Sequence, residues 1–330
     1  MKTAFVTGGT GFIGSRLIAL LVERGVRVRA LARSQAGLEK VKALGAEPVQ
    51  GDVIDPASLK DAMCGCDVVF HVASMYEVGL RYKAQMEKVN VDGVRNVIEA
   101  AWKAGVPKIV FTSTIGVFGD TRGKLVDEIY EYKGQFSTVY ERTKWTAHYQ
   151  VVLPLIKQGA PVVIVMPSAT FGPDDHSTVN DLMKLHMRGR LPILPGKETT
   201  FSHVYVDDVA EGHILAAEKG RIGEAYLLTG TVLSFSEFVK LWAKVSGRPA
   251  PVLEVSSALL RIWWPLFTLL ERIFPMPALL SGEAVRVLGA TWIASSEKAQ
   301  RELGYCPRPV EEGLKLTFDW LKKQYNQSRR

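Results

Sequence analysis

The sequence predicts an α/β fold in which a doubly wound parallel Rossmann sheet is accompanied by a smaller, mostly helical part. Two observations carry this prediction. Short apolar runs with strand character alternate with helical stretches, and several of these runs are apolar throughout. Strands of that kind are buried on both faces, which requires helices on both sides of a parallel sheet. Because crossovers are right-handed, the sheet is doubly wound and binds ligands at the carboxyl ends of its strands.

The expected elements follow one another along the chain. The expected strands span residues 3–6, 26–32, 47–50, 67–71, 108–113, 161–166 and 225–228. The expected helices span residues 15–25, 37–44, 55–63, 81–104, 137–157 and 206–219. After Pro167, prolines and glycines interrupt the alternation and indicate loops, and helices are expected to dominate the end of the chain.

A glycine-rich turn, Thr7-Gly-Gly-Thr-Gly-Phe-Ile-Gly14, lies between the first strand and the first helix. Gly8 suits a tight turn, Gly11 leaves room for a pyrophosphate, and Gly14 lets the helix pack closely on the strand. The helix N-terminus offers unpaired N–H groups to phosphates. An ordinary glycine-rich turn is the alternative, but the flanking strand and helix favour a dinucleotide site. The expected cofactor-binding residues here are Gly8, Thr10, Gly11, Phe12, Ile13 and Gly14.

The length of 330 residues allows a large domain with a smaller companion. We expect residues 1–167 and 203–231 to form the dinucleotide-binding domain. Residues 168–202 and 232–330 then form a substrate-binding part that is threaded through it.

The composition narrows the class of ligand. The formal charge of +7 suits a ligand that carries phosphates, but the basic residues are scattered, so we expect no nucleic-acid partner. Three cysteines, Cys64, Cys66 and Cys306, form neither a disulfide framework nor a strong metal motif. We therefore expect free thiols, a cytoplasmic location and no metal site.

One apolar stretch, residues 259–280, has the composition of a membrane-contacting segment. Its longest uncharged run, between Arg261 and Glu271, is far shorter than the ~20 residues of a spanning helix. The sequence leaves open whether this stretch is a core helix, a lid over an apolar pocket or a peripheral membrane contact.

The end of the second expected strand predicts the preferred nicotinamide cofactor. An NAD site usually has an acidic residue there, whereas this chain has Ala32 followed by Arg33. A guanidinium without a competing carboxylate favours a 2′-phosphate, so we expect NADP(H) to be preferred over NAD(H). Arg29 helps if its side chain faces the same way. Asp52 and Val53, after the third strand, are placed to contact the adenine.

Tyr140 and Lys144 are four residues apart in an expected helix and therefore share a face. A nearby ammonium stabilises a phenolate, so Lys144 is expected to lower the pKa of Tyr140 toward the range useful in acid–base catalysis. The fifth strand ends in hydroxyl side chains that could orient a substrate carbonyl. These hydroxyls belong to Thr112, Ser113 and Thr114.

These motifs together resemble the extended short-chain dehydrogenase/reductase family. The resemblance implies that Tyr140 is the acid/base, that Lys144 also holds the nicotinamide ribose, and that Asn90 lies near the active site. It further implies that Ala73, in the loop 71–74, contacts the cofactor and that Pro167 lies beside the nicotinamide. By the same resemblance, Thr114 is the expected substrate-orienting hydroxyl, with Ser113 left open. The family's sugar dehydratases place Asp-Glu directly after the strand-end threonine, where this chain has Ile115 and Gly116.

Among family members, the chain looks most like the branch of dihydroflavonol reductases and 3β-hydroxysteroid dehydrogenases. The resemblance implies an NADP(H)-dependent interconversion of a ketone and a secondary alcohol on a hydrophobic, cyclic substrate. An NAD-dependent nucleotide-sugar epimerase and a cofactor-sensing regulator without catalysis are the alternatives. A homodimer is left open. Aromatic and aliphatic residues expected to form a lid or interdomain core are Trp263, Trp264, Phe267, Leu270, Ile273, Phe274 and Met276.

Three further groups of polar residues receive non-catalytic interpretations. His176, His186 and His203 are expected to be loop or surface residues. Asp207 and Asp208 are expected to cap a helix and pack the two parts together. The pair at 127–128 is expected to be a solvated turn.

Overall fold

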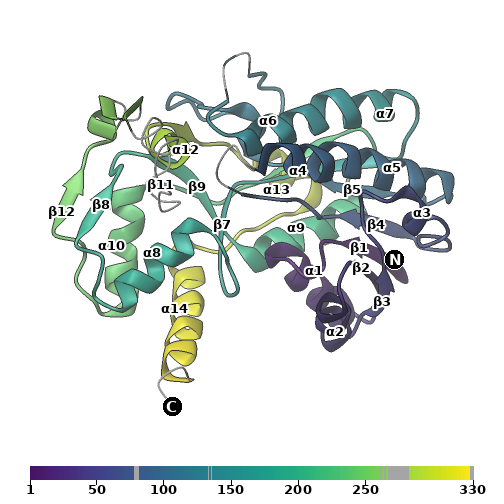
Figure 1. Ribbon diagram of the computed structural model, residues 1–330, viewed down its shortest axis with the longest axis horizontal. Coiled ribbons are helices and arrows are strands. Elements are labelled where there is room, and N and C mark those ends of the chain that lie inside the picture. Colours follow the sequence, from purple (N-terminus) through teal and green to yellow (C-terminus); the bar gives the residue numbers. More distant parts are fainter. Residues whose placement is uncertain are drawn as a thin grey trace.

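The computed structural model describes residues 1–77, 82–132, 134, 136–260, 262–263, 265–266 and 282–327. Seven parallel strands form the central sheet, in the order β10-β6-β5-β4-β1-β2-β3, and the predicted doubly wound Rossmann sheet is confirmed (Figure 1). The strands are β1 (Thr3–Thr7), β2 (Arg27–Ala32), β3 (Glu47–Gln50), β4 (Val68–His71), β5 (Ile109–Thr112), β6 (Val162–Pro167) and β10 (Ala225–Leu228).

Helices cover both faces of this sheet. Strands β4, β5 and β6 are therefore buried along their whole length. Two apolar clusters of side chains fill the two interfaces. One face is covered by α3 (Pro56–Leu59), α5 (Gly93–Lys103), the π-helical turn η4 (Thr146–Val152) and α7 (Leu153–Lys157). The other face is covered by α1 (Phe12–Glu23), α2 (Gln35–Ala43), α9 (Val206–Lys219) and α13 (Glu297–Leu303).

Two of the expected long helices are divided by π-helical turns. The first consists of α4 (Lys83–Glu87), η2 (Lys88–Asp92) and α5. The second begins with α6 (Val139–Trp145) and continues through η4 into α7. A π-helical turn has one extra residue per turn, which rotates the side chains that follow and is frequent at functional sites. The expected helix over 55–63 is confirmed only for its first half, in α3.

The smaller part contains more strand than the sequence predicts. A second sheet has the order β11-β9-β13, and β7 also pairs with β9. Its strands are β7 (Ala169–Phe171), β9 (Thr200–Tyr205), β11 (Thr231–Ser234) and β13 (Thr291–Trp292), while β8 (Ile193–Pro195) pairs with β12 (Leu253–Val255). The helices are α8 (Thr178–Met187), α10 (Phe235–Ser246), α12 (Gly282–Val287) and α14 (Val310–Gln327). The expectation of loops after Pro167 is wrong for these segments, because all of these strands except β9 have only two to four residues and leave little periodicity in the sequence.

Ion pairs at the start of α9 join separate segments of the chain. Asp207 accepts two hydrogen bonds from the guanidinium of Arg16 in α1, at 2.5 and 2.8 Å. Asp208 pairs with Arg308 at 2.9 Å, just before α14. Both acids therefore pack segments together, as expected, although they lie in the first turn of α9 rather than at its N-cap.

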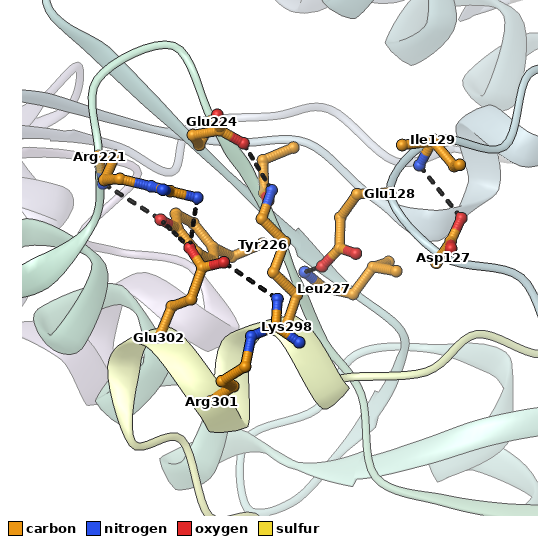
Figure 2. Close-up of polar contacts among 11 residues, drawn as sticks. Asp127, Glu128, Ile129, Arg221, Glu224, Tyr226, Leu227, Lys298, Arg301 and Glu302 are labelled. Atoms are coloured by element: carbon orange, nitrogen blue, oxygen red, sulfur yellow. Dashed lines mark hydrogen bonds and ion pairs between the residues drawn. The ribbon is translucent and has the colours of Figure 1, made fainter.

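The outer edge of the central sheet is covered by side chains (Figure 2). Lys298 of α13 donates to the backbone carbonyl of Ala225 in β10, at 2.8 Å. The Glu128 carboxylate accepts from the backbone N–H of Leu227 in the same strand, at 2.9 Å. The expectation of a solvated turn is wrong for Glu128, whose pKa is raised by burial.

Within the described residues, no helix is both long enough and apolar enough to cross a membrane. Most of the apolar stretch 259–280, including Trp264, Phe267, Leu270, Ile273, Phe274 and Met276, lies outside the described residues. Trp263 is described and is half exposed.

Candidate active site

The glycine turn between β1 and α1 requires glycine at two positions. Gly8 has a φ of +73°, and its carbonyl accepts a hydrogen bond from the N–H of Gly11 at 2.9 Å. A Cβ at Gly8 would lie 2.6 Å from the backbone nitrogen of Ala73, and a Cβ at Gly14 would lie 2.1 Å from the Gly8 oxygen. The turn therefore packs tightly against the loop after β4 and against its own helix. Ala73 is thus placed directly beside the turn.

The N-terminus of α1 fits a phosphate group. Gly11 is its N-cap and has no side chain that could accept from the first N–H groups, and the first turn contains no acidic residue. Thr10, Phe12 and Ile13 surround this helix end, and all three residues are partly buried. Backbone N–H groups at a helix start that no side chain caps are suited to a pyrophosphate. These residues would hold the diphosphate of a dinucleotide.

The carboxyl ends of β2 and β3 bring Arg33 and Asp52 together. Their side chains form an ion pair at 3.8 Å, and the Arg33 side chain is 67% exposed. Val53, the next residue along, is buried in the core and contacts α5. Arg29 does not join this site, because it lies earlier in β2 and donates to the carbonyl of Cys64. Arg33, expected at a 2′-phosphate, and Asp52, expected at the adenine, thus lie side by side at one edge of the sheet, whereas Val53 lies in the core.

Tyr140 and Lys144 lie on α6, above the end of β5. Lys144 is 2% exposed, and its ammonium donates to the backbone carbonyl of Thr112 at 2.8 Å. Burial lowers the pKa of Lys144 to about 7. The pKa of Tyr140 is raised rather than lowered, mainly because burial disfavours its phenolate, while a hydrogen bond with Ser74 opposes the rise. The expected lowering of the Tyr140 pKa by Lys144 is therefore wrong for this structure.

The two hydroxyl residues at the end of β5 have different surroundings. Ser113 is buried, and its hydroxyl is hydrogen-bonded to Nδ1 of His148 at 2.8 Å. Thr114 is partly exposed and caps the 3₁₀ turn η3 (Ile115–Phe118), accepting from the N–H of Gly116 at 3.1 Å. Its greater exposure makes Thr114 the better placed of the two to meet a substrate.

Asn90 connects the loop after β4 to the helix that carries Tyr140. It lies fully buried in η2. Its amide oxygen accepts from the backbone N–H of Met75 at 2.7 Å and from the hydroxyl of Ser74 at 3.1 Å. Its amide nitrogen donates to the Met75 carbonyl at 2.9 Å and to the hydroxyl of Thr143 at 3.0 Å. Asn90 is thus near the predicted site, where it holds backbone and side chains in place.

Buried imidazoles lie near Lys144. Two of them, His148 and His213, were not among the residues expected from the sequence. His148 lies one turn after Lys144 on the same helical run, and His213 of α9 is hydrogen-bonded to the hydroxyl of Thr112 at 2.9 Å. His71 of β4 is hydrogen-bonded to the hydroxyl of Thr7 at 2.7 Å. Burial lowers the pKa of His71 to about 3 and of His148 to about 4, and the charge of Lys144 adds to both effects. The i, i+4 spacing from Lys144 is the only sequence signal that could have indicated His148.

An apolar cavity of about 200 Å³ lies next to Tyr140. Tyr76, whose ring centroid is 4.9 Å from that of Tyr140, and Thr138, the N-cap of α6, form its wall on this side. Among the described residues that line the cavity, none is Asp, Glu, Lys or Arg. Its aromatic lining comes from the smaller part of the chain and consists of Phe171, Phe201, Phe235 and Phe238.

His203 and His186 are not the loop or surface residues that the sequence suggested. His203 lies in β9, is 4% exposed and lines the cavity, with its ring stacked on Phe238 at 3.8 Å. Burial lowers its pKa to about 3. His186 is buried in α8, where Nε2 is hydrogen-bonded to Ser246. His176 is exposed, as expected. Pro167 is buried at the end of β6, opposite Leu228.

Comparison with known proteins agrees with this arrangement. Residues 5–223 match the model of the 3-beta hydroxysteroid dehydrogenase/isomerase family. A relative from Stigmatella aurantiaca, named 4-hydroxy-2-methyl-3-oxo-4-farnesyl-3,4-dihydroquinoline-1-oxide ketoreductase, is 36% identical over 95% of both chains. A putative dihydroflavonol 4-reductase from Synechocystis sp. is 31% identical over 96% of this chain and 94% of its own.

A solved structure shares the fold over nearly the whole chain. The crystal structure of gox2253 superimposes with a TM-score of 0.85 at 33% identity, over 98% of this chain and 99% of that one. The family match covers most of the sheet and the whole of α6, where Tyr140 and Lys144 lie. The chain therefore belongs to the 3-beta hydroxysteroid dehydrogenase/isomerase family within the extended short-chain dehydrogenases/reductases, and it is an NAD(P)-dependent oxidoreductase.

Proposed function

We propose that the protein is an NADP(H)-dependent reductase that interconverts a ketone and a secondary alcohol on a hydrophobic, cyclic substrate. The observation that carries the proposal is the apolar cavity beside Tyr140, whose described lining residues include four phenylalanines and no Asp, Glu, Lys or Arg. Water leaves such a cavity readily when an apolar ligand enters, whereas a charged ligand would lose its hydration without gaining a partner. The cavity therefore favours a neutral, apolar substrate.

Tyr140 is the proposed proton donor and Thr114 the proposed substrate-orienting group. The Tyr140 phenol, whose ordinary pKa of about 10 is raised further by burial, is protonated at neutral pH and can donate a proton to a carbonyl oxygen. The Thr114 hydroxyl would orient that carbonyl. When bound, a reduced nicotinamide would supply a hydride to the carbonyl carbon, so the carbon gains a hydride and the oxygen gains a proton. Lys144 would hold the nicotinamide ribose.

The names of the relatives support the same substrate class. The Stigmatella ketoreductase is named for a substrate that carries a keto group on a ring system together with a farnesyl chain. The Synechocystis relative is named for a dihydroflavonol, which is also cyclic and uncharged. A ring-bearing ketone fits the aromatic lining of the cavity beside Tyr140.

The nucleotide-sugar epimerase is the weaker alternative, because cationic side chains are the strongest partners for the phosphates of a nucleoside diphosphate. The described residues of the cavity include no such cation. A regulator without catalysis is also weaker, because a protein that only senses cofactor has no need of a phenol beside an apolar cavity.

The proposal is tested by following NADPH oxidation with a panel of steroid, flavonoid and terpenoid ketones. We expect turnover by the natural chain, and we expect Tyr140→Phe to lower kcat by about 10²- to 10⁴-fold while NADPH affinity is retained. Tyr149→Phe, on the same helical run but outside the described cavity lining, is the matched control and should keep its activity. Full turnover by Tyr140→Phe, or turnover of a nucleotide sugar instead of every ketone, would contradict the proposal.

A further inference from the structure

We propose that Tyr76 is a substrate-positioning residue that selects ketones whose carbonyl belongs to a ring. This inference rests on the proposed function, since it concerns the substrate of the same site. Tyr76 lies between the two features on which that function depends. It lines the apolar cavity, and its ring contacts the ring of Tyr140.

The geometry of the two tyrosines places a substrate ring. Their ring centroids are 4.9 Å apart and their planes are inclined at 84°. The two nearly perpendicular rings are in contact, and the Tyr76 side chain also forms part of the cavity wall. Tyr76 is 55% exposed, so a large part of its side chain is accessible to a ligand. In the proposed binding mode, a carbonyl at the Tyr140 hydroxyl has its neighbouring carbon atoms beside Tyr76.

The loop that carries Tyr76 is held in register with the catalytic helix. The residue before it, Met75, has both its backbone N–H and its carbonyl hydrogen-bonded to the buried side chain of Asn90. The same amide donates to Thr143, which lies three residues after Tyr140. One buried side chain thus sets the relative positions of the two tyrosines. A residue whose backbone is fixed in this way can position a ligand at little entropic cost.

The remainder of the cavity is suited to an apolar substrate with a broad face. The side chains of Phe171, Phe201 and Phe238 also line the cavity, and they come from other segments of the chain than Tyr76 and Thr138. Aromatic rings make their largest contact with other flat faces. A fused ring presents such a face at the atoms next to its carbonyl, whereas a flexible chain does not. Loss of the Tyr76 ring should therefore affect a cyclic ketone more than an open-chain ketone of the same size.

The test compares two ketones with the same number of carbon atoms, trans-1-decalone and 2-decanone. For Tyr76→Ala we expect kcat/KM for trans-1-decalone to fall by about 10-fold or more, mainly through KM, because the substrate is positioned less well rather than activated less. For 2-decanone we expect a change below about 3-fold. Tyr76→Phe should behave like the natural chain, since it keeps the ring.

Controls separate positioning from damage to the site. Tyr325→Ala, in the last turns of α14 and outside the described cavity lining, should change neither ketone's kinetics. NADPH affinity should be the same in all variants. Equal losses for both ketones, a fall in kcat without a rise in KM, or no loss for either would each overturn the proposal.

Failure of the proposed function would give a different result. If the natural chain reduces neither this pair nor any ketone of the panel, the proposed function is contradicted, and the role of Tyr76 is then tested by calorimetric binding of trans-1-decalone in the presence of NADP⁺. Weaker binding by Tyr76→Ala, with unchanged binding by Tyr76→Phe, would support the positioning role without turnover. Equal binding by all three proteins, or no binding by the natural chain, would overturn it.

Discussion

The ammonium of Lys144 donates to the backbone carbonyl of Thr112, 2.8 Å away, from a position that is nearly closed to solvent. The ring of Phe111 lies 5.1 Å from the same nitrogen, and two neutral imidazoles are close enough for their pKa values to be lowered by its charge. No carboxylate is among the groups that shift the pKa of Lys144. The natural chain thus buries a cation with dipoles and rings as its neighbours, which lowers its pKa to about 7.

This burial predicts a pH dependence of stability that Lys144→Met should remove. Between pH 7 and the ordinary lysine pKa of 10.5, the unfolded chain binds one more proton at this residue than the folded chain does. The free energy of unfolding contributed by Lys144 therefore rises with pH in this window, by at most about 1.4 kcal/mol per pH unit. Urea unfolding of both proteins from pH 7 to pH 9.5 measures the difference (both pH values lying within the window). Parallel curves for the two proteins would contradict a lowered pKa.

The buried amide of Asn90 predicts a large loss of stability on truncation. Asn90→Ala removes four hydrogen bonds and leaves the backbone N–H of Met75 without that partner. We expect a loss of about 2–4 kcal/mol, since each net hydrogen bond contributes about 1 kcal/mol and an unpaired buried group adds to the cost. Asn96→Ala, which removes one hydrogen bond to the Val53 carbonyl, is the matched control. Urea unfolding measures both, and equal losses would refute the special role of Asn90.

The exposed Arg33 side chain at the carboxyl end of β2 predicts how the chain distinguishes its cofactors, although a 2′-phosphate would have to compete with Asp52 for it. If the Arg33 guanidinium pairs with a 2′-phosphate, Arg33→Ala should weaken NADPH binding by about 10-fold or more and leave NADH binding nearly unchanged. Added salt should weaken NADPH binding to the natural chain more than to the variant, because the contact is exposed. Fluorescence titration measures all four affinities.

Arg27→Ala is the matched control for that titration. Arg27 is equally exposed and also forms an ion pair between β2 and β3, with Glu47 at 2.8 Å, but it lies at the opposite end of the strands. It should leave both affinities unchanged. Tighter binding of NADH than of NADPH by the natural chain would show that Arg33 does not bind a 2′-phosphate. An equal loss of NADPH affinity in Arg33→Ala and Arg27→Ala would show the same.

Local patterns in the sequence predicted the parts of the site that depend on neighbours in the chain. The turn at Gly8, the face shared by Tyr140 and Lys144, and the apolar strands of the central sheet all follow from spacings of a few residues. Such patterns report backbone conformation and burial directly. The fold of the dinucleotide-binding half was predictable for this reason.

Contacts between distant residues account for what the sequence could not predict. His203 resembles a surface residue in the sequence, yet pairing of β9 with β7 and β11 places it under Phe238 in the cavity wall. The raised pKa of Tyr140 has the same origin, because the burial that causes it depends on a loop more than sixty residues earlier that carries Ser74 and Tyr76. Neither relationship leaves a periodic signal in the chain.

The side chains at the edge of the central sheet predict resistance to aggregation. β10 pairs with β6 on one side only, so its Ala225 carbonyl and Leu227 N–H point outward. Lys298 and Glu128 satisfy these two groups (Figure 2). An edge strand with unpaired backbone groups is a template for pairing with another chain. The double variant Glu128→Ala/Lys298→Ala should therefore aggregate faster than the natural chain on warming, as measured by light scattering.

Arg301→Ala provides the comparison for that experiment. Arg301 lies on the same helix as Lys298 and contacts Glu302, but no backbone group of β10. Arg301→Ala removes one positive charge, as Lys298→Ala does, while the sheet edge stays covered. If net charge controlled aggregation, Arg301→Ala would act like Lys298→Ala alone. If the covered edge controls aggregation, only the variants at Lys298 and Glu128 should aggregate faster than the natural chain. Equal aggregation rates for Arg301→Ala and Lys298→Ala would exclude this role for the two side chains.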